Sequence, residues 1–249
     1  MRPRSVEPEI LDELAGNAPE AQRSRRDLQR IHRLMWTRTI LRKALFAYGA
    51  AHHGQRPMRV LELGAGDGTL MLGFARLVHS QWPAVELTLL DRTDIVEPST
   101  IAGYADLGWK MTRASTDVRA WAGEASAARD GGTGRWDLIL ANLFLHHFKD
   151  AELALLLKAI AKRTNGFFAC EPRRSRLAAL GSLLMGIGVN AVTRADAAVS
   201  VRAGFRDHEL KSLWLPPEGR WAVREYPAGL FSHCFHARRD VHLIAGGSP

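Results

Sequence analysis

Residues 60–69 read Val-Leu-Glu-Leu-Gly-Ala-Gly-Asp-Gly-Thr, and this stretch decides the fold of the chain. A short apolar run breaks into three glycines at alternating positions, and an amphipathic segment follows over residues 70–78. The order predicts a strand, a tight turn and a helix, because glycine adopts positive φ and lets a ligand approach the backbone. The N-terminus of such a helix directs free N–H groups and a positive dipole end at the turn. We therefore expect a nucleotide-type site at the carboxyl end of a strand, as in open α/β sheets.

The spacing of Gly64, Gly66 and Gly68 distinguishes between nucleotide cofactors. A dinucleotide site reads G-x-G-x-x-G, but Thr69 stands at the position of its third glycine. An acid, Glu62, lies two residues before the first glycine. The resulting pattern, E-x-G-x-G-x-G, resembles the first motif of the class I S-adenosylmethionine-dependent methyltransferases. It disfavours a dinucleotide enzyme.

Length and composition fit one large globular domain. The chain has 249 residues, of which 46% are hydrophobic, and this argues against disorder. No apolar run reaches the roughly 18–20 residues that a transmembrane helix needs, and the N-terminus lacks the apolar core of a signal peptide. The expected location is therefore cytoplasmic. The two cysteines, Cys170 and Cys234, are expected to be buried free thiols.

The formal net charge is +8. Such a balance fits nucleic acid, an acidic membrane surface or an anionic substrate as a partner. The basic residues are dispersed, apart from concentrations over residues 23–43 and 173–176. Arg173 and Arg174, in the range 173–176, are expected either to lie in a solvated loop or to bind an acidic acceptor. Nucleic acid is disfavoured as the partner.

The order of apolar runs and turns predicts an α/β fold. It is a Rossmann-like, doubly wound sheet that is mostly parallel, with an antiparallel hairpin at the C-terminal end, because the last two strands leave no room for a helical crossover. A seven-stranded sheet of this kind is also what the resemblance implies. The expected strands cover residues 59–63, 85–90, 109–115, 136–142, 166–170, 207–215 and 230–238.

Outside the sheet, helical spacing dominates the N-terminal part of the chain. Residues 1–55 are expected to form an arm with a short helix over 9–15, followed by helical structure over 21–51 that caps the site or simply presents a solvated face. Residues 56–249 then form the methyltransferase domain. The apolar segment 177–189 walls an acceptor pocket or belongs to the core, and membrane contact is a third reading; residues 123–134 are expected to be a surface loop or frayed helix end.

Two further acids match cofactor positions that the resemblance implies. Asp91 ends the second strand, 23 residues after Gly68, where an acid accepts hydrogen bonds from a ribose diol; Asp94 or Glu97 remain as substitutes. Asp117 follows the third strand, where the family contacts the adenine amino group, and the next N–H reaches a ring nitrogen. The alternative for Asp117 is a helix N-cap.

The stretch Asp-Leu-Ile-Leu-Ala-Asn-Leu-Phe-Leu-His-His-Phe over residues 137–148 resembles the fourth motif of small-molecule methyltransferases of the ubiquinone- and polyketide-modifying sort. It lacks the N/D-P-P-Y pattern of many enzymes that methylate nucleic-acid amines. His146 or His147 is the expected base, since a histidine with a pKa of about 6.5 accepts a proton at neutral pH. Alternatively, one histidine is structural and the other faces solvent. Glu171 is a weaker candidate, and no pattern suggests a metal.

The resemblance thus implies methyl transfer from S-adenosylmethionine to a small aromatic, polyketide or lipid-like acceptor, with oxygen favoured over carbon. The rival readings are an RNA or protein methyltransferase and a non-catalytic cofactor-binding module. The expected partners are a small-molecule acceptor and, as an option, a second copy of the chain. The expected cofactor contacts are Glu62, Gly64, Ala65, Gly66, Gly68, Asp91, Arg92, Asp117, Val118, Asn142 and Leu143.

Overall fold

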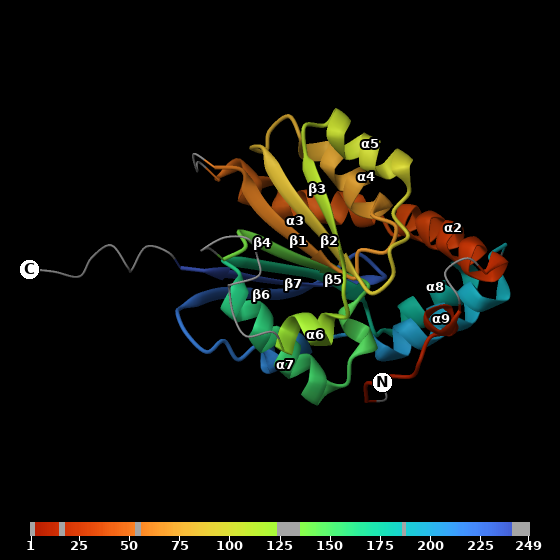
Figure 1. The fold of residues 1–249 in the computed structure, drawn as a ribbon. Helices are drawn as coiled ribbons and strands as arrows, with labels where there is room; N and C mark the ends of the chain where they lie inside the picture. The colour runs from red at the N-terminus through yellow and green to blue at the C-terminus, as the bar shows by residue number, and fades with distance from the viewer. Residues whose placement is uncertain (1–2, 15–17, 53–55, 124–134, 186–187, 241–249) are drawn as a thin grey trace, which may run out of the picture.

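A computed structural model describes the chain except for residues 1–2, 15–17, 53–55, 124–134, 186–187 and 241–249 (Figure 1). Its centre is a seven-stranded sheet in the order β3-β2-β1-β4-β5-β7-β6. Strands β1 to β5 run parallel to one another, and β7 runs antiparallel to both β5 and β6. The expected fold class is therefore confirmed. The strands are β1 (Met58–Leu63), β2 (Val85–Asp91), β3 (Lys110–Ser115), β4 (Leu138–Asn142), β5 (Gly166–Pro172), β6 (Trp221–Ala228) and β7 (Ser232–Arg239).

Helices cover both faces of the sheet and extend beyond the carboxyl ends of its parallel strands. In Figure 1, α3, α4 and α5 lie on one face, α6 and α7 lie on the other, and α2, α8 and α9 stand to one side. The helices are α1 (Ile10–Glu13), α2 (Pro19–Leu34), α3 (Thr37–Ala50), α4 (Thr69–Val78), α5 (Pro98–Asp106), α6 (Val118–Gly123), the 3₁₀ turn η1 (Leu145–His147), α7 (Asp150–Arg163), α8 (Arg176–Met185), α9 (Ala191–Ala203) and α10 (Glu209–Leu213).

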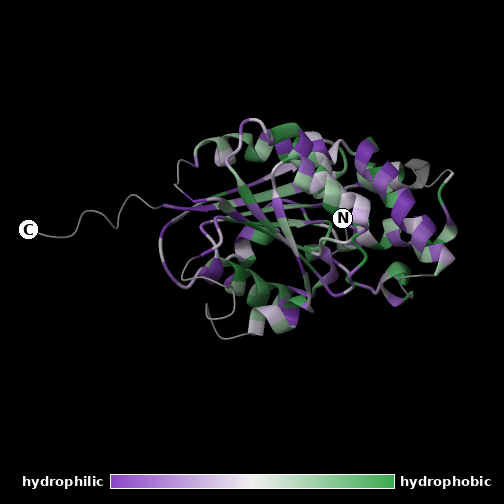
Figure 2. Ribbon diagram, turned by 45° about the horizontal axis from the view of Figure 1, so that its top comes forward, coloured by the Kyte–Doolittle hydropathy of each residue, from purple (hydrophilic) through white to green (hydrophobic). Residues whose placement is uncertain are grey.

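Two hydrophobic clusters fill the spaces between the sheet and its helices. One joins the sheet to α6, α7 and α10, and the other joins it to α3, α4 and α5. Hydrophobic residues accordingly concentrate in the strands between the helical layers (Figure 2). Cys170 and Cys234 are buried free thiols, as expected. The core thus holds the strands rigidly, and their carboxyl ends form a common edge.

The sixth strand expected over residues 207–215 is wrong, because a short helix, α10, occupies that stretch and β6 comes later. Leu210, Leu213 and Trp214 have the i, i+3, i+4 spacing that places side chains on one face of a helix. Glu225 of β6 accepts hydrogen bonds from two backbone N–H groups of α10, at 3.1 and 2.7 Å. The expected C-terminal hairpin is present, but β6 and β7 form it.

The helical stretch over residues 21–51 is divided into two helices, α2 and α3. The break lies at Trp36, which has a left-handed backbone conformation with φ of 57° and a side chain exposed to solvent. No glycine or proline marks the break in the sequence. Its cause is tertiary: α3 packs on α4 against the sheet, whereas α2 also contacts α9 beyond the strand ends. One straight helix cannot make both contacts.

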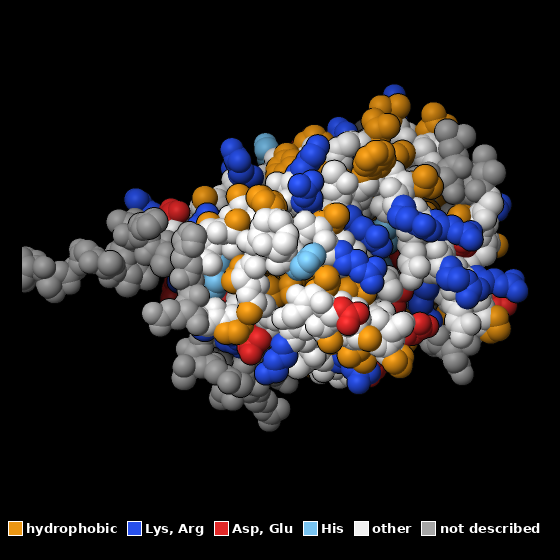
Figure 3. All heavy atoms as spheres, turned by 90° about the horizontal axis from the view of Figure 1, so that it is seen from above, with side chains coloured by type: hydrophobic (Ala, Val, Ile, Leu, Met, Phe, Trp, Pro, Cys, Tyr) orange, Lys and Arg blue, Asp and Glu red, His pale blue; other side chains and the backbone are white. Residues whose placement is uncertain are grey.

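The surface carries more basic than acidic side chains on the face drawn in Figure 3, and these are interspersed with apolar and uncharged groups. Among the described residues, no helix is long and apolar enough to cross a membrane. The surface loop expected over residues 123–134 lies outside the described residues except for Gly123, which ends α6.

Candidate functional site

The glycine turn after β1 has two crowded positions and one open one. All three glycines have positive φ, at 68°, 55° and 70° for Gly64, Gly66 and Gly68. A Cβ on Gly64 would lie 2.2 Å from the Phe144 ring, and one on Gly68 would lie 2.8 Å from Leu89. A Cβ on Gly66 would meet no atom within 4 Å. The backbone at Gly66 therefore borders open space, where a ligand can approach it.

Asp91 at the end of β2 lies against this turn. One carboxylate oxygen accepts a hydrogen bond from the Gly66 N–H at 2.9 Å, and the other accepts one from the N–H two residues further on, at 3.0 Å. The two alternative acids are placed elsewhere. Asp94 pairs with Arg113 of β3 at 2.9 Å, and Glu97 is exposed at the start of α5. Of the three acids, Asp91 is the one bound to the turn.

Two buried oxygens at the same edge have no hydrogen-bond partner among the described residues. They are Oε2 of Glu62 and Oδ1 of Asn142, on the adjacent strands β1 and β4. Burial raises the pKa of Glu62 to about 8, and the negative charges of Asp67 and Asp91 contribute to the rise. The edge is therefore rich in hydrogen-bond acceptors, which favour a cationic ligand with N–H groups.

Asp117 and Val118 lie where β3 passes into α6. The exposed carboxylate of Asp117 accepts a hydrogen bond from the Arg119 N–H at 2.7 Å, an N-cap type of contact, while the Val118 side chain is buried. Ala65 lies within the glycine turn, and its N–H donates to a β2 carbonyl at 3.1 Å. Arg92 is exposed beside Asp91.

The loop after β4 is built around the fully buried carboxylate of Glu171, at the end of β5. Oε1 accepts hydrogen bonds from the N–H groups of Phe144 and Leu145, at 3.1 and 2.9 Å. Oε2 accepts from the backbone N–H and from Nδ1 of His146, at 3.3 and 2.9 Å. These bonds hold a tight turn in which Leu143 has φ of 48°. Glu171 thus fixes the orientation of the His146 ring.

The second ring nitrogen of His146 reaches a carboxylate from the N-terminal end of the chain. Nε2 lies 3.3 Å from Oε1 of Glu9. Burial lowers the pKa of His146, but the hydrogen bonds and charges of Glu171 and Glu9 outweigh it and raise the pKa to about 9. His146 is therefore an imidazolium at neutral pH. The half-buried His147 ring lies 4.3 Å away, centroid to centroid.

Glu9, His146 and His147 also have ligand atoms within 4.8 Å of one another, a spacing that a metal ion could bridge. His146 makes direct contacts with the carboxylates of Glu9 and Glu171 through its two ring nitrogens, which leaves neither nitrogen for an ion, and we assign none.

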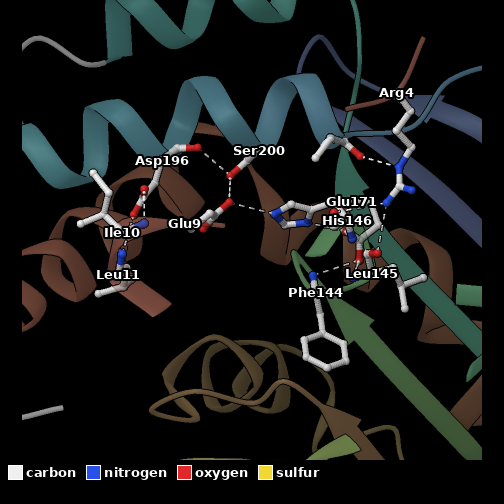
Figure 4. Close-up of polar contacts among 11 residues, drawn as sticks. Arg4, Glu9, Ile10, Leu11, Phe144, Leu145, His146, Glu171, Asp196 and Ser200 are labelled. Carbon is white, nitrogen blue, oxygen red and sulfur yellow. Dashed lines mark hydrogen bonds and ion pairs between the residues drawn. The ribbon is translucent and has the colours of Figure 1, made fainter. Parts of the chain in front are cut away.

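Glu9 belongs to a segment, residues 3–14, that we call the N-terminal strap. Its two anchors are shown in Figure 4. The buried guanidinium of Arg4 donates to the last carbonyl of α9 at 2.8 Å and to the carbonyl after η1 at 2.7 Å. The N–H groups of Ile10 and Leu11 donate to the two carboxylate oxygens of Asp196 in α9, at 2.8 and 3.0 Å. The strap is thereby fastened across the carboxyl edge of the sheet.

An apolar cavity of about 750 Å³, part of it open to solvent, lies between the strap, α2, α8 and α9. Leu143, which follows Asn142 at the end of β4, lines it at the cofactor edge. Ala178, Ser182 and Val189 from the apolar segment 177–189 contribute to its wall. The other lining residues are Glu9, Leu11, Ser24, Leu28, Ile31, Met35, Pro172, Thr193, Asp196, Ala197, Ser200, Val201 and Phe231.

Sequence reasoning missed three residues of this region and misplaced a fourth. Arg4, Glu9 and Asp196 carry no local signal, because their partners lie far away in the sequence; Arg4 and its α9 acceptor are 199 residues apart. Arg174 was expected in a solvated loop or at an acidic acceptor, but it is buried and donates to the carbonyl of Gly204 at 2.6 Å. Its role is therefore to hold α9 and α10 against the sheet.

The model of a family described as "Methyltransferase domain" matches residues 27–214. The chain belongs to this methyltransferase family. No curated protein sequence matches it significantly.

Solved structures resemble the methyltransferase over nearly its whole length. The plantazolicin methyltransferase BpumL, solved with a desmethyl analogue and S-adenosylhomocysteine (SAH), has a TM-score of 0.66 at 14% identity and covers 93% of this chain and 94% of its own. Magnesium protoporphyrin IX methyltransferase from Synechocystis PCC 6803, with bound SAH, has a TM-score of 0.55 at 13% identity. The match covers 90% of this chain and 96% of that protein. N,N-8-amino-8-demethyl-D-riboflavin dimethyltransferase from Streptomyces davawensis has a TM-score of 0.56 at 16% identity, and the match covers 94% of this chain and 62% of that protein. At these identities the likeness concerns the fold.

The residues at the carboxyl edge of the methyltransferase fit S-adenosylmethionine. That molecule carries an ammonium group and a sulfonium cation, which suit the unpartnered oxygens of Glu62 and Asn142 and the acidic surroundings that Asp67 and Asp91 provide. The open space at Gly66 leaves room beside the turn. α2 also reaches this edge, since Gln29 donates to Asp67 at 2.8 Å.

Proposed function

We propose that this methyltransferase uses S-adenosylmethionine to methylate a small, largely apolar acceptor of aromatic, polyketide or lipid-like character, with oxygen favoured as the methylated atom and carbon next. The observation that carries the proposal is the apolar cavity, which meets the cofactor edge at Leu143. An acceptor in this cavity lies next to the residues that fit the methyl donor. Its apolar walls favour an acceptor of the same character.

Each cofactor contact has a physical role in this proposal. Glu62 and Asn142 accept hydrogen bonds from the methionine ammonium, directly or through water. Asp91 holds the ribose diol, and Asp117 with the Val118 N–H contacts the adenine. When bound, the cofactor supplies a sulfonium-activated methyl group. The protein then has mainly to align two reactants, which lowers a barrier by several kcal/mol through proximity alone.

Methylation of a neutral hydroxyl forms a carbon–oxygen bond as the carbon–sulfur bond of the cofactor breaks. The hydroxyl proton must leave as well, because the oxygen would otherwise carry a positive charge. His146 is poorly suited as the base, since it is already protonated at neutral pH and both its nitrogens contact carboxylates. We therefore assign the role of base to His147, which lies beside it. His146 is a positioning residue that keeps the loop after β4 in place.

Two experiments test the proposal in sequence. Calorimetric titration with S-adenosylmethionine and SAH should give micromolar binding, while NADH should not bind. Tritiated cofactor should then label at least one member of a panel of phenols, quinols and polyketides. Cofactor binding without any labelling, in the panel or in lysate, would favour a non-catalytic module. A salt-sensitive gel shift with RNA would favour a nucleic-acid acceptor instead.

A further inference from the structure

The cavity contains a carboxylate oxygen that lacks a donor. Glu9 lines the cavity from the strap, and its Oε1 contacts both Nε2 of His146 and the hydroxyl of Ser200. Among the described residues no hydrogen bond reaches its Oε2, although the side chain is only 13% exposed. Figure 4 shows the carboxylate between Ser200 and His146. Asp196 also lines the cavity, but both of its oxygens accept backbone N–H groups.

The carboxylate of Glu9 remains ionised despite its surroundings. Burial raises the pKa of Glu9, but the hydrogen bond and charge of His146, the charge of His147 and the hydrogen bond of Ser200 together outweigh burial and bring the pKa below its ordinary value. His146 is itself held by Glu171, so the orientation of the three groups is fixed from the core outward. An ionised oxygen in an apolar cavity is costly unless a donor satisfies it.

Resting on the function proposed above, we propose that Glu9 determines acceptor specificity: its carboxylate binds a hydrogen-bond donor, such as a hydroxyl, an amide N–H or an ammonium group, on an otherwise apolar acceptor. The same charge rejects anionic acceptors. The burial of Arg174 agrees with this, because it removes one of the cations that an acidic acceptor would need.

The cavity therefore presents this ionised oxygen only while the strap is docked. Arg4 and Asp196 fasten the strap on either side of Glu9. Among the described lining residues, Thr193 of α9 offers a hydroxyl oxygen without a partner, but that oxygen carries no charge, and both oxygens of Asp196 accept backbone N–H groups. Specificity thus resides in a segment outside the stretch that matches the family model, which begins at residue 27.

An isosteric pair of probes tests this inference on the full chain loaded with SAH. The probes are 2-naphthol and 2-methylnaphthalene, which differ by a hydroxyl in place of a methyl group, and binding is measured by calorimetry. Wild-type protein should bind 2-naphthol at least about tenfold more tightly, the scale of a hydrogen bond to a charged group. Glu9→Ala should lose this preference. Glu7→Ala, an exposed acid on the same strap, should keep it.

Several outcomes would overturn the inference. Equal affinities for the two probes in wild-type protein, no binding of either, or an unchanged preference in Glu9→Ala would each do so. Loss of 2-naphthol binding on adding EDTA would show that an ion, and not the bare carboxylate, receives the hydroxyl. Glu9→Gln preserves the shape of the side chain but removes its charge; it should show a reduced preference for 2-naphthol with an unchanged affinity for SAH, which separates recognition from folding.

Failure of this inference is distinguishable from failure of the proposed function. If SAH binds to wild-type protein but Glu9→Ala keeps the preference for 2-naphthol, only the role of Glu9 is lost. If neither SAH nor S-adenosylmethionine binds, the proposed function fails, and the inference fails with it.

Discussion

The cofactor edge and the acceptor cavity of this methyltransferase are neighbours, but they are built in opposite ways. The cofactor edge takes most of its groups from short stretches at strand ends, such as Glu62 to Gly68 and Asn142 to Leu143. The cavity is lined by residues from Glu9 to Phe231. A rigid turn is encoded locally, whereas a cavity of this kind requires distant segments to meet. The edge can therefore be stable alone, while the cavity depends on the strap.

The two regions also differ in the hydrogen-bond acceptors that they offer to a ligand. At the cofactor edge, the buried oxygens of Glu62 and Asn142 have no described donor. The cavity is mostly apolar and has the Glu9 carboxylate at its strap side. The first region therefore favours a ligand with several donors, and the second favours an apolar ligand with a single donor. Substitutions on each side should affect one ligand and spare the other.

The largest expected effect on ligand binding is at the cofactor edge, in Gly66→Ala. Cofactor affinity should fall at least about 100-fold, because the new methyl group occupies the open space beside the turn. Gly108→Ala is a matched control: its φ is 72°, and a Cβ there also meets nothing within 4 Å. Both variants should lose similar folding stability, but only Gly66→Ala should lose binding of SAH in a calorimetric titration. Equal affinities would mean that the ligand does not approach Gly66.

The acceptor side should respond most strongly to Arg4→Ala. Removal of this buried guanidinium leaves several backbone carbonyls without a donor, so the free energy of unfolding should fall by about 3 kcal/mol. Urea unfolding measures the loss, and limited proteolysis should cut the strap faster. Glu7→Ala removes an exposed ion pair with Arg202 and an exposed hydrogen bond from the Ser5 hydroxyl, and it should change stability by less than about 0.5 kcal/mol. SAH binding should survive in both variants if the two regions are independent.

The stability that His146 contributes through its contacts with Glu9 and Glu171 should fall as the pH rises. The pKa of His146 is about 9 in the folded protein, above its unfolded value of about 6.5. Its stabilising contribution is therefore complete below pH 6.5 and is lost as pH rises through 9. The loss should be about 3 kcal/mol in unfolding free energy. The difference between wild-type and His146→Gln stability, measured by urea unfolding from pH 6 to 9.5, should show this trend; a flat difference would contradict it.

The smallest effect is expected for cofactor binding below neutral pH. Because the pKa of Glu62 is about 8, a cationic ligand must displace a proton to pair with its carboxylate. Affinity for S-adenosylmethionine should be about tenfold higher at pH 7 than at pH 6, equivalent to about 1.4 kcal/mol. Calorimetry in buffers of different ionisation enthalpy should detect about one released proton. Glu62→Gln should remove both signatures, and their persistence would assign the proton to another group.

Much of the fold could be predicted from residue spacing, but two local structures were not. A strand was expected over residues 207–215, yet the spacing of Leu210, Leu213 and Trp214 is helical, and Glu225 stabilises a helix there. The break at Trp36, in contrast, has no local signal. There a contact with a distant element decided the local structure, and a single sequence contains no record of such contacts.

By itself, the sequence determined the glycine turn, the strands that flank it and the acids that surround it, because each depends on the backbone preferences and periodicity of adjacent residues. The likeness to methyltransferases followed from those same stretches. Only the tertiary structure decided that His146 is held between Glu171 and Glu9 and that the strap completes the cavity. Glu9 and His146 are 137 residues apart in the sequence, and only packing of the folded chain brings them together.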